Sequence, residues 1–225
     1  MLSELSIPSE MSVNDLRSLV KTGEGTYLEF KRTLSSARKI VREIAAFANT
    51  NGGNLLVGVD DDKSLIGVSG YHEEEFVLHQ AAYEMCRPAV PIQIEIIHFL
   101  ADRDIMLVRV PEMEEKPIYV KKGKKKRVVY VREKDKSVVA TDQQVAILSK
   151  ETSKNGVTFE YGPNEQKLFR YLKEYHKITV KDFSDLIDVT SYRASSILVN
   201  LVSAGILELY SNDSKEYYSF SADCS

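Results

Sequence analysis

The chain has 225 residues, of which 43% are hydrophobic and 28% are charged, and its formal net charge is −3 at pH 7. This length can bury the core of one large or two small domains, and the acidic balance argues against a protein that coats nucleic acid indiscriminately. No apolar run approaches the roughly 18 residues of a membrane span, the first residues lack the pattern of a signal peptide, and there are only two cysteines, so we expect a cytoplasmic protein with no membrane partner.

The chain is predicted to begin with a helix followed by a short strand. The helix spans 13–20, where apolar residues recur at helical spacing. In the strand, Leu28 and Phe30 face one side of a sheet, whereas Glu29 and Lys31 face the other, because side chains alternate along a strand. One face of this strand is therefore apolar and the other is charged.

A second helix is predicted after Ser35 or Ser36, either of which can cap it. Its apolar stripe consists of Ile40, Val41, Ile44, Ala45 and Ala48. Gly52 and Gly53 follow the helix, and glycine readily takes the positive φ that ends one. The glycines are therefore interpreted as a helix cap and a tight turn.

A buried strand is predicted over 55–59, and it leads into three consecutive aspartates at 60–62. Residues 64–68 are expected to return as its partner in a hairpin. The pair would place the aspartates in the connecting turn, a common position for this residue type.

Three blocks in this part of the chain carry a family resemblance. GEGTYLEFK, AFANTNGG and GVDDDKSLIGV resemble, in this order, the AlbA-like domain of the Schlafen family, and the resemblance covers roughly residues 10 to 150. It implies a domain that binds nucleic acid and, in some members, cleaves RNA with a divalent metal and three acidic residues. Vertebrate Schlafen cores resemble two such lobes around a groove. A chain with one lobe is therefore expected to form a homodimer.

The rest of the first domain is predicted to alternate between helix and strand. A helix over 73–87 is stopped by Pro88. Strands are expected at 92–96, 105–110, 118–120 and 128–131, and a last helix opens at the capping-box pattern of residues 141–144. The fold class is therefore α+β, with a mixed sheet and flanking helices over residues 1–150.

The pattern of predicted elements changes after residue 150. A polar linker is predicted over 151–158. Within 159–225, three helices at 164–175, 179–187 and 192–204 precede two strands at 206–210 and 216–220. Three helices followed by a hairpin is the order of a winged helix, a variant of the helix-turn-helix. We therefore predict a small winged-helix domain.

Three acidic residues are candidate metal ligands. The Schlafen resemblance assigns this role to Glu24, Glu29 and Asp60, which would hold Mg²⁺ or Mn²⁺ in a nuclease, because these hard cations prefer carboxylate oxygens from several segments. Asp61 or Asp62 could replace Asp60. Alternatively, Glu29 forms a surface ion pair with its neighbour on the same face and the aspartates only make a turn.

ATP is not expected as a ligand. A glycine-rich loop that binds phosphate precedes a helix, where the helix dipole is positive, whereas Gly52 and Gly53 follow one. The chain also has no GxxxxGK[ST] motif. No other cofactor is predicted with certainty.

A dense basic run is the main candidate for contact with nucleic acid. Six of the seven residues from 121 to 127 are cationic, at the tip of a predicted hairpin. Such a run is often merely solvated, but its density favours contact with phosphates. The predicted contacts in this domain are Lys31, Lys121, Lys122, Lys124, Lys125, Lys126, Arg127 and Arg132.

The third predicted helix of the second domain is a further candidate. Ser191, Tyr192 and Arg193 lie at its start, where winged helices enter the major groove. However, residues 151–225 hold 8 Lys and Arg against 11 Asp and Glu, and many winged helices bind proteins instead.

The main hypothesis is a transcriptional regulator that binds nucleic acid, with DNA favoured over RNA. The alternative is a metal-dependent endoribonuclease that uses Glu24, Glu29 and Asp60. A third possibility, a module that binds only proteins, explains the acidic second domain but not the basic run.

Overall fold

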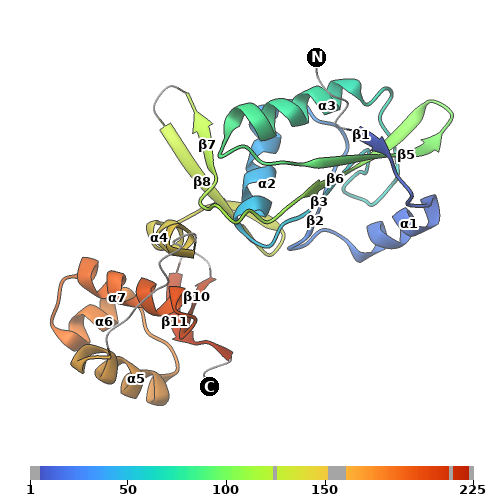
Figure 1. Ribbon diagram of the computed structural model, residues 1–225. Coiled ribbons are helices and arrows are strands. Elements are labelled where there is room, and N and C mark those ends of the chain that lie inside the picture. The colour runs from blue at the N-terminus through green and yellow to red at the C-terminus, as the bar shows by residue number, and fades with distance from the viewer. Residues whose placement is uncertain (1–5, 124–125, 152–160, 213–214, 223–225) are drawn as a thin grey trace. The chain divides into compact units, whose positions relative to one another are not determined.

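The computed structural model describes residues 6–123, 126–151, 161–212 and 215–222. They form two compact units, one up to Ala140 and one from Thr141 onward (Figure 1). Among the described residues, no helix combines the length and the apolar character that crossing a bilayer requires. Each unit has its own core and is described by itself.

The first unit is built on a five-stranded mixed sheet. Its strands, in spatial order, are β1 (Ser6–Pro8), β5 (Gln93–Leu100), β6 (Arg103–Val110), β3 (Gly53–Val57) and β2 (Leu28–Lys31). The two edge strands run parallel to their neighbours, and the inner pairs are antiparallel. This arrangement confirms the predicted α+β class and makes β2 an edge strand.

Two helices cover the two faces of this sheet. Helix α1 (Val13–Thr22) packs Leu16 and Val20 against Phe30 and Leu56. Helix α2 (Ala37–Asn49) covers the opposite face, and ten of its thirteen residues are buried. A single apolar stripe cannot explain this burial. The second side of α2 must therefore also be covered by protein.

A smaller sheet provides this cover. It consists of β4 (Cys86–Arg87), β7 (Tyr119–Lys122), β8 (Lys126–Glu133) and β9 (Lys136–Val139), all antiparallel. Strand β8 lies along α2, and Tyr130 joins the core around that helix. Helix α2 is therefore enclosed between the two sheets (Figure 1).

Several elements differ from their predicted form. The helix expected over 73–87 is α3 (His72–His79) followed by a π-helix, η1 (Gln80–Met85), and its last two residues are strand β4. The hairpin partner expected over 64–68 is reduced to a single bridge between Val59 and Leu65, because Gly58 and Gly67 take positive φ and turn the backbone out of register.

The described residues of the second unit form four helices and a hairpin. Its elements are α4 (Asp142–Glu151), α5 (Pro163–Tyr175), α6 (Val180–Ile187), α7 (Ser191–Ser203), β10 (Leu207–Asn212) and β11 (Lys215–Phe220). Leu168, Phe183, Leu198 and Tyr218 form the centre of its core. Helix α4, expected at the end of the first domain, packs against α7, so the division falls before the predicted linker.

Gly52 and Gly53 have the structural role expected of them. Gly52 has φ of 69°, and a Cβ there would lie 2.8 Å from the carbonyl oxygen of Val110. A Cβ on Gly53 would collide with the ring of Phe47 in α2. The glycines therefore allow the turn and the close approach of helix and strand.

Candidate functional site

The carboxylate of Glu24 closes the outer edge of strand β2. The Phe30 backbone N–H donates a hydrogen bond of 2.8 Å to Glu24 Oε1, and the Gly25 N–H donates one of 2.9 Å to the Leu28 carbonyl. An edge strand otherwise presents unpaired backbone groups to other chains. Glu24 therefore accepts a hydrogen bond from a backbone group that the edge strand would otherwise leave unpaired, although Glu24 itself is exposed to solvent.

Glu29 is part of a buried ion-pair network centred on Arg132. Arg132 Nη2 lies 2.7 Å from Glu29 Oε2, and Arg132 Nη1 lies 3.3 Å from Glu43 Oε2. The guanidinium also donates to the Gly25 carbonyl at 2.8 Å and stacks 4.8 Å from the Phe47 ring centre. The Arg132 side chain is 0% exposed. This residue therefore cannot reach a phosphate backbone as predicted, and it holds two sheets and a helix together.

Lys31 is part of the same ion-pair network. Its ammonium group pairs with Glu29 Oε1 and donates a hydrogen bond of 2.9 Å to the Phe30 carbonyl. The expected pairing of Lys31 with Glu29 is thus present, but Glu29 is buried rather than on the surface. Lys31 neutralises a buried carboxylate, which leaves it little freedom to bind phosphate.

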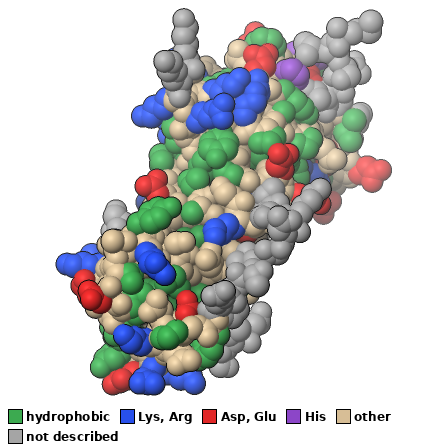
Figure 2. Space-filling model, turned by 60° about the vertical axis from the view of Figure 1, so that its left-hand side comes forward, with side chains coloured by type: hydrophobic (Ala, Val, Ile, Leu, Met, Phe, Trp, Pro, Cys, Tyr) green, Lys and Arg blue, Asp and Glu red, His purple; other side chains and the backbone are tan. Residues whose placement is uncertain are grey.

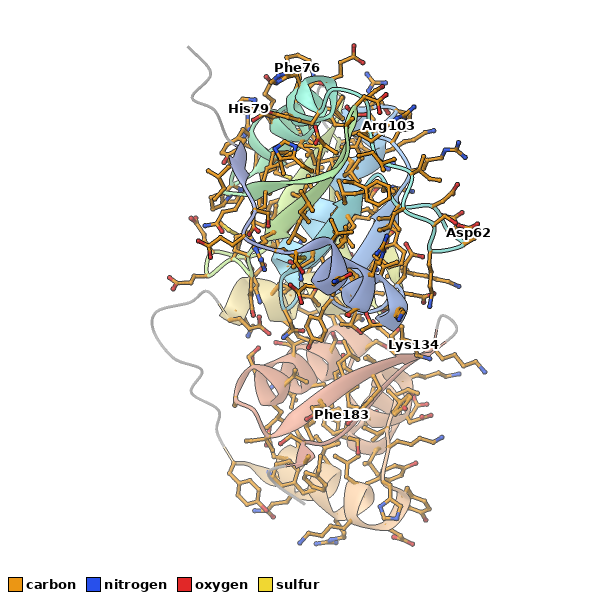
Figure 3. All side chains as sticks on the ribbon, turned by 90° about the vertical axis from the view of Figure 1, so that its right-hand side faces the viewer. Asp62, Phe76, His79, Arg103, Lys134 and Phe183 are labelled. Carbon is orange, nitrogen blue, oxygen red and sulfur yellow. The ribbon has the colours of Figure 1, made fainter. Side chains whose placement is uncertain are left out.

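The aspartates after β3 form a turn. Asp60 Oδ2 lies 3.0 Å from Arg32 Nη1, and Asp60 Oδ1 accepts from the Asp61 N–H. Asp62 accepts from the Ser64 N–H at 2.8 Å, and hydrogen bonds from Ser64 lower the pKa of Asp62. Asp62 lies at the outer edge of the unit in Figure 3.

These acids do not converge. Among the described residues, no group of three His, Cys, Asp or Glu side chains could hold a metal ion. The reason is geometric: Glu29 faces α2, Glu24 turns onto the edge of its own strand, and Asp60 pairs with Arg32 at the turn. The metal site predicted from Glu24, Glu29 and Asp60 is therefore not formed, and these residues do not fit Mg²⁺ or Mn²⁺.

The cations of the basic run lie on the β7–β8 hairpin. Lys121 is directly opposite Arg127, and Lys122 is directly opposite Lys126. Because neighbouring side chains alternate, one pair lies on each face of the hairpin. All four residues are exposed. The predicted contacts Lys124 and Lys125 lie outside the described residues.

Two of these cations are supported by aromatic rings. Lys122 Nζ lies 5.3 Å from the centre of the Tyr130 ring, and Arg127 Cζ lies 6.0 Å from that of Tyr119. Within the described part of the chain, none of the four hairpin cations forms a salt bridge. The hairpin therefore carries four positive charges that have no carboxylate within salt-bridge distance among the described residues.

The sequence contains a signal that separates Arg132 from the surface cations. Along β8, the residues from Val128 to Val131 form an apolar run that is buried on both faces toward its end, and Arg132 directly follows this run, whereas Lys126 and Arg127 precede it. Glu43 could be found in a similar way, because it lies between Ile40 and Phe47 on the buried stripe of α2. The pairing of Arg132 with Glu43 in the interior was not predicted.

In the second unit, the three predicted contact residues lie together at the first turn of α7. Ser191, Tyr192 and Arg193 are all exposed, and the Tyr192 residue is 87% exposed. Thr190 begins the helix, since its side chain accepts a hydrogen bond from the Arg193 N–H. An aromatic ring this exposed gains nothing from the core and is available to a partner.

Comparisons with known proteins find one matching family and several similar solved structures. The model of the family described as Schlafen, AlbA_2 matches residues 24–141. The solution structure of the N-terminal domain of a RecG-related protein from Nitrosomonas europaea is 21% identical, covers 68% of this chain and 97% of its own, and has a TM-score of 0.43.

The crystal structure of the DIP2311 protein from Corynebacterium diphtheriae is 15% identical and covers 77% of this chain, with a TM-score of 0.45. The match spans 32% of that longer chain. Among curated proteins, none matches.

Proposed function

Because the chain belongs to the Schlafen AlbA_2 family, we propose that it binds nucleic acid, DNA in preference to RNA, and acts as a transcriptional regulator. The β7–β8 hairpin supplies the contacts to the phosphate backbone. The first unit provides affinity, and the second unit adds specificity.

One observation carries this proposal: the hairpin places like charges directly across from one another on both of its faces. Such pairs destabilise a hairpin, because the charges repel at the short distance between paired strands. A polyanion that inserts beside the hairpin relieves the repulsion and releases its own counterions. The unbalanced charge is therefore best explained by a partner such as nucleic acid.

Binding of a labelled duplex, measured by fluorescence anisotropy at several salt concentrations, tests the proposal. Affinity is expected to fall steeply and linearly on a logarithmic salt scale, as it does when phosphate contacts dominate. Absence of binding of the duplex and of its single strands, even at low salt, would contradict the proposed function.

We further propose that the second unit is a winged helix whose α7 enters the major groove. Its order of α5, α6, α7, β10 and β11 and the exposed first turn of α7 support this. Replacing Arg193 by alanine is then expected to reduce discrimination between a preferred and a scrambled duplex by about tenfold, the effect of losing one good base contact. A selected binding site provides the preferred duplex.

Lys215 provides the control for this prediction. It is exposed at the start of β11, so Lys215→Ala removes the same charge from the same unit away from the first turn of α7. Equal loss of affinity for both duplexes in the Arg193 variant would show that the residue contacts only phosphate.

We also propose that two copies of the chain associate, so that two lobes face one nucleic-acid segment. Sedimentation at micromolar concentration is expected to give twice the mass of the chain. A single-chain mass both with and without DNA would exclude this assembly. The edge of β2 is already closed by Glu24 and Gly25, so pairing through that edge is disfavoured.

Metal-dependent RNA cleavage is not proposed. Each of the three acids that it requires is engaged with a partner: Glu24 with the Phe30 backbone, Glu29 with the buried Arg132 and Asp60 with Arg32 at the surface.

A further inference from the structure

A cavity of about 670 Å³ lies beside strand β7 of the β7–β8 hairpin. It is bounded by the first turn of α2, by η1 and by the end of β7. Its apolar lining comes from Ala37, Val41, Met85 and Val120. This volume is within the usual range of small-molecule sites, and the lining suits a flat apolar group.

The rim of the cavity is cationic. Arg38, Lys121 and Lys122 line it together with Ser36 and Gln80, and the described lining residues include no Asp or Glu. Exposed cations beside exposed hydrophobic side chains can also be seen in the upper part of Figure 2. The first turn of α2 adds to the positive potential, since Ser36 makes no capping hydrogen bond with its side chain.

This combination defines the chemistry of a ligand. An apolar floor favours a planar ring, whereas Arg38 and Lys122, with no carboxylate among the described lining residues, favour a phosphate near that ring. Arg38 can bind phosphate with two parallel hydrogen bonds, and Lys122 is held in place by the Tyr130 ring. A nucleotide combines these two features, since its sugar joins a planar base to a phosphate.

We propose that this cavity binds one unpaired nucleotide, with its base on the apolar floor and its phosphate between Arg38 and Lys122. The inference rests on the proposed nucleic-acid binding and specifies its substrate. A base within a duplex is stacked on both faces, so it cannot enter an apolar cavity without leaving the helix. The chain therefore prefers a single-stranded or locally opened segment, which passes from the hairpin into the cavity.

The substitution Gln80→Glu tests this site with little change in shape. Gln80 is half-buried and lines the cavity, so a carboxylate there repels a bound phosphate. We expect its affinity for a single strand of about 12 nucleotides to fall about tenfold or more, with less than about a twofold change for a duplex. Gln93→Glu is the matched control, because Gln93 is exposed on β5 and lines a different cavity.

A strand with one 2-aminopurine provides a second readout, because this base changes its fluorescence when it leaves a stack. The signal is expected to change on binding to the wild-type chain and to the Gln93 variant but not to the Gln80 variant. The monophosphate of the 2-aminopurine nucleoside distinguishes the source of the ligand. If this monomer displaces the labelled strand as well as an unlabelled strand does at equal concentration, the ligand is a free nucleotide. If only the unlabelled strand displaces it, the ligand is a nucleic acid.

The two proposals fail in different ways. Equal affinities of the Gln80 and Gln93 variants for single strands, with binding otherwise intact, overturn the nucleotide cavity and leave the proposed function in place. Absence of binding of any oligonucleotide by the wild-type chain overturns the proposed function. A duplex bound more tightly than its single strands, with unchanged 2-aminopurine fluorescence, also overturns the cavity proposal.

Discussion

Replacing Arg132 by alanine is expected to lower the free energy of unfolding by about 3–5 kcal/mol, because it removes the fully buried cation that pairs with two buried carboxylates. Glu29 and Glu43 are each 7% exposed, and the guanidinium lies between them. The loss of packing on the Phe47 ring adds to this cost. Urea unfolding followed by circular dichroism measures the change.

Arg127→Ala is the control for this prediction. It removes the same side chain from the same strand at an exposed position, so a change within about 0.5 kcal/mol is expected. A third variant, Arg132→Met with both glutamates changed to glutamine, should recover much of the lost stability, since no buried charge then remains. A loss below about 1 kcal/mol in Arg132→Ala would contradict the structural role assigned to this network.

The second prediction concerns the exposed cations of the hairpin. Changing Lys121, Lys122, Lys126 and Arg127 together to glutamine is expected to weaken duplex binding roughly 100-fold at low salt. Each phosphate contact contributes about 0.9 to the slope of log affinity against log salt, so the slope should become shallower by about 3 to 4. Anisotropy titrations at four salt concentrations give both quantities.

A variant with equal loss of charge separates local contact from general attraction. Arg17, Lys21, Lys134 and Lys136 are exposed elsewhere on the first unit, and their combined change to glutamine removes the same four charges. It is expected to reduce affinity by less than about fivefold, because charges beyond a Debye length are screened. If both variants lose affinity to the same extent, the hairpin is not the site of contact.

The two predictions also separate residues that the sequence places together. Arg127 and Arg132 lie five positions apart on one strand, yet we expect the first to affect binding and the second to affect stability. The difference arises from position along the strand, since Arg127 lies at its exposed start and Arg132 follows the buried run from Val129 to Val131.

The sequence alone determined the features that depend on neighbours in the chain. The helices α1, α6 and α7, the alternation in β2 and the turn at the aspartates follow from local periodicity and turn chemistry. The positions of the exposed cations on β7 and β8 also follow from their place in a hairpin. The family resemblance could also be recognised from the sequence, because each of its three blocks is a contiguous segment.

Only the tertiary structure decided which distant groups meet. Glu29 and Arg132 are 103 residues apart in the chain, and Glu43 reaches the same guanidinium from a helix. A carboxylate such as that of Glu29 can serve as a metal ligand, a surface charge or a buried ion-pair partner, and the group packed opposite it decides which role it takes. Local spacing fixes the face on which a side chain lies, whereas packing of the second sheet over α2 fixes its partner, and the partner sets the role.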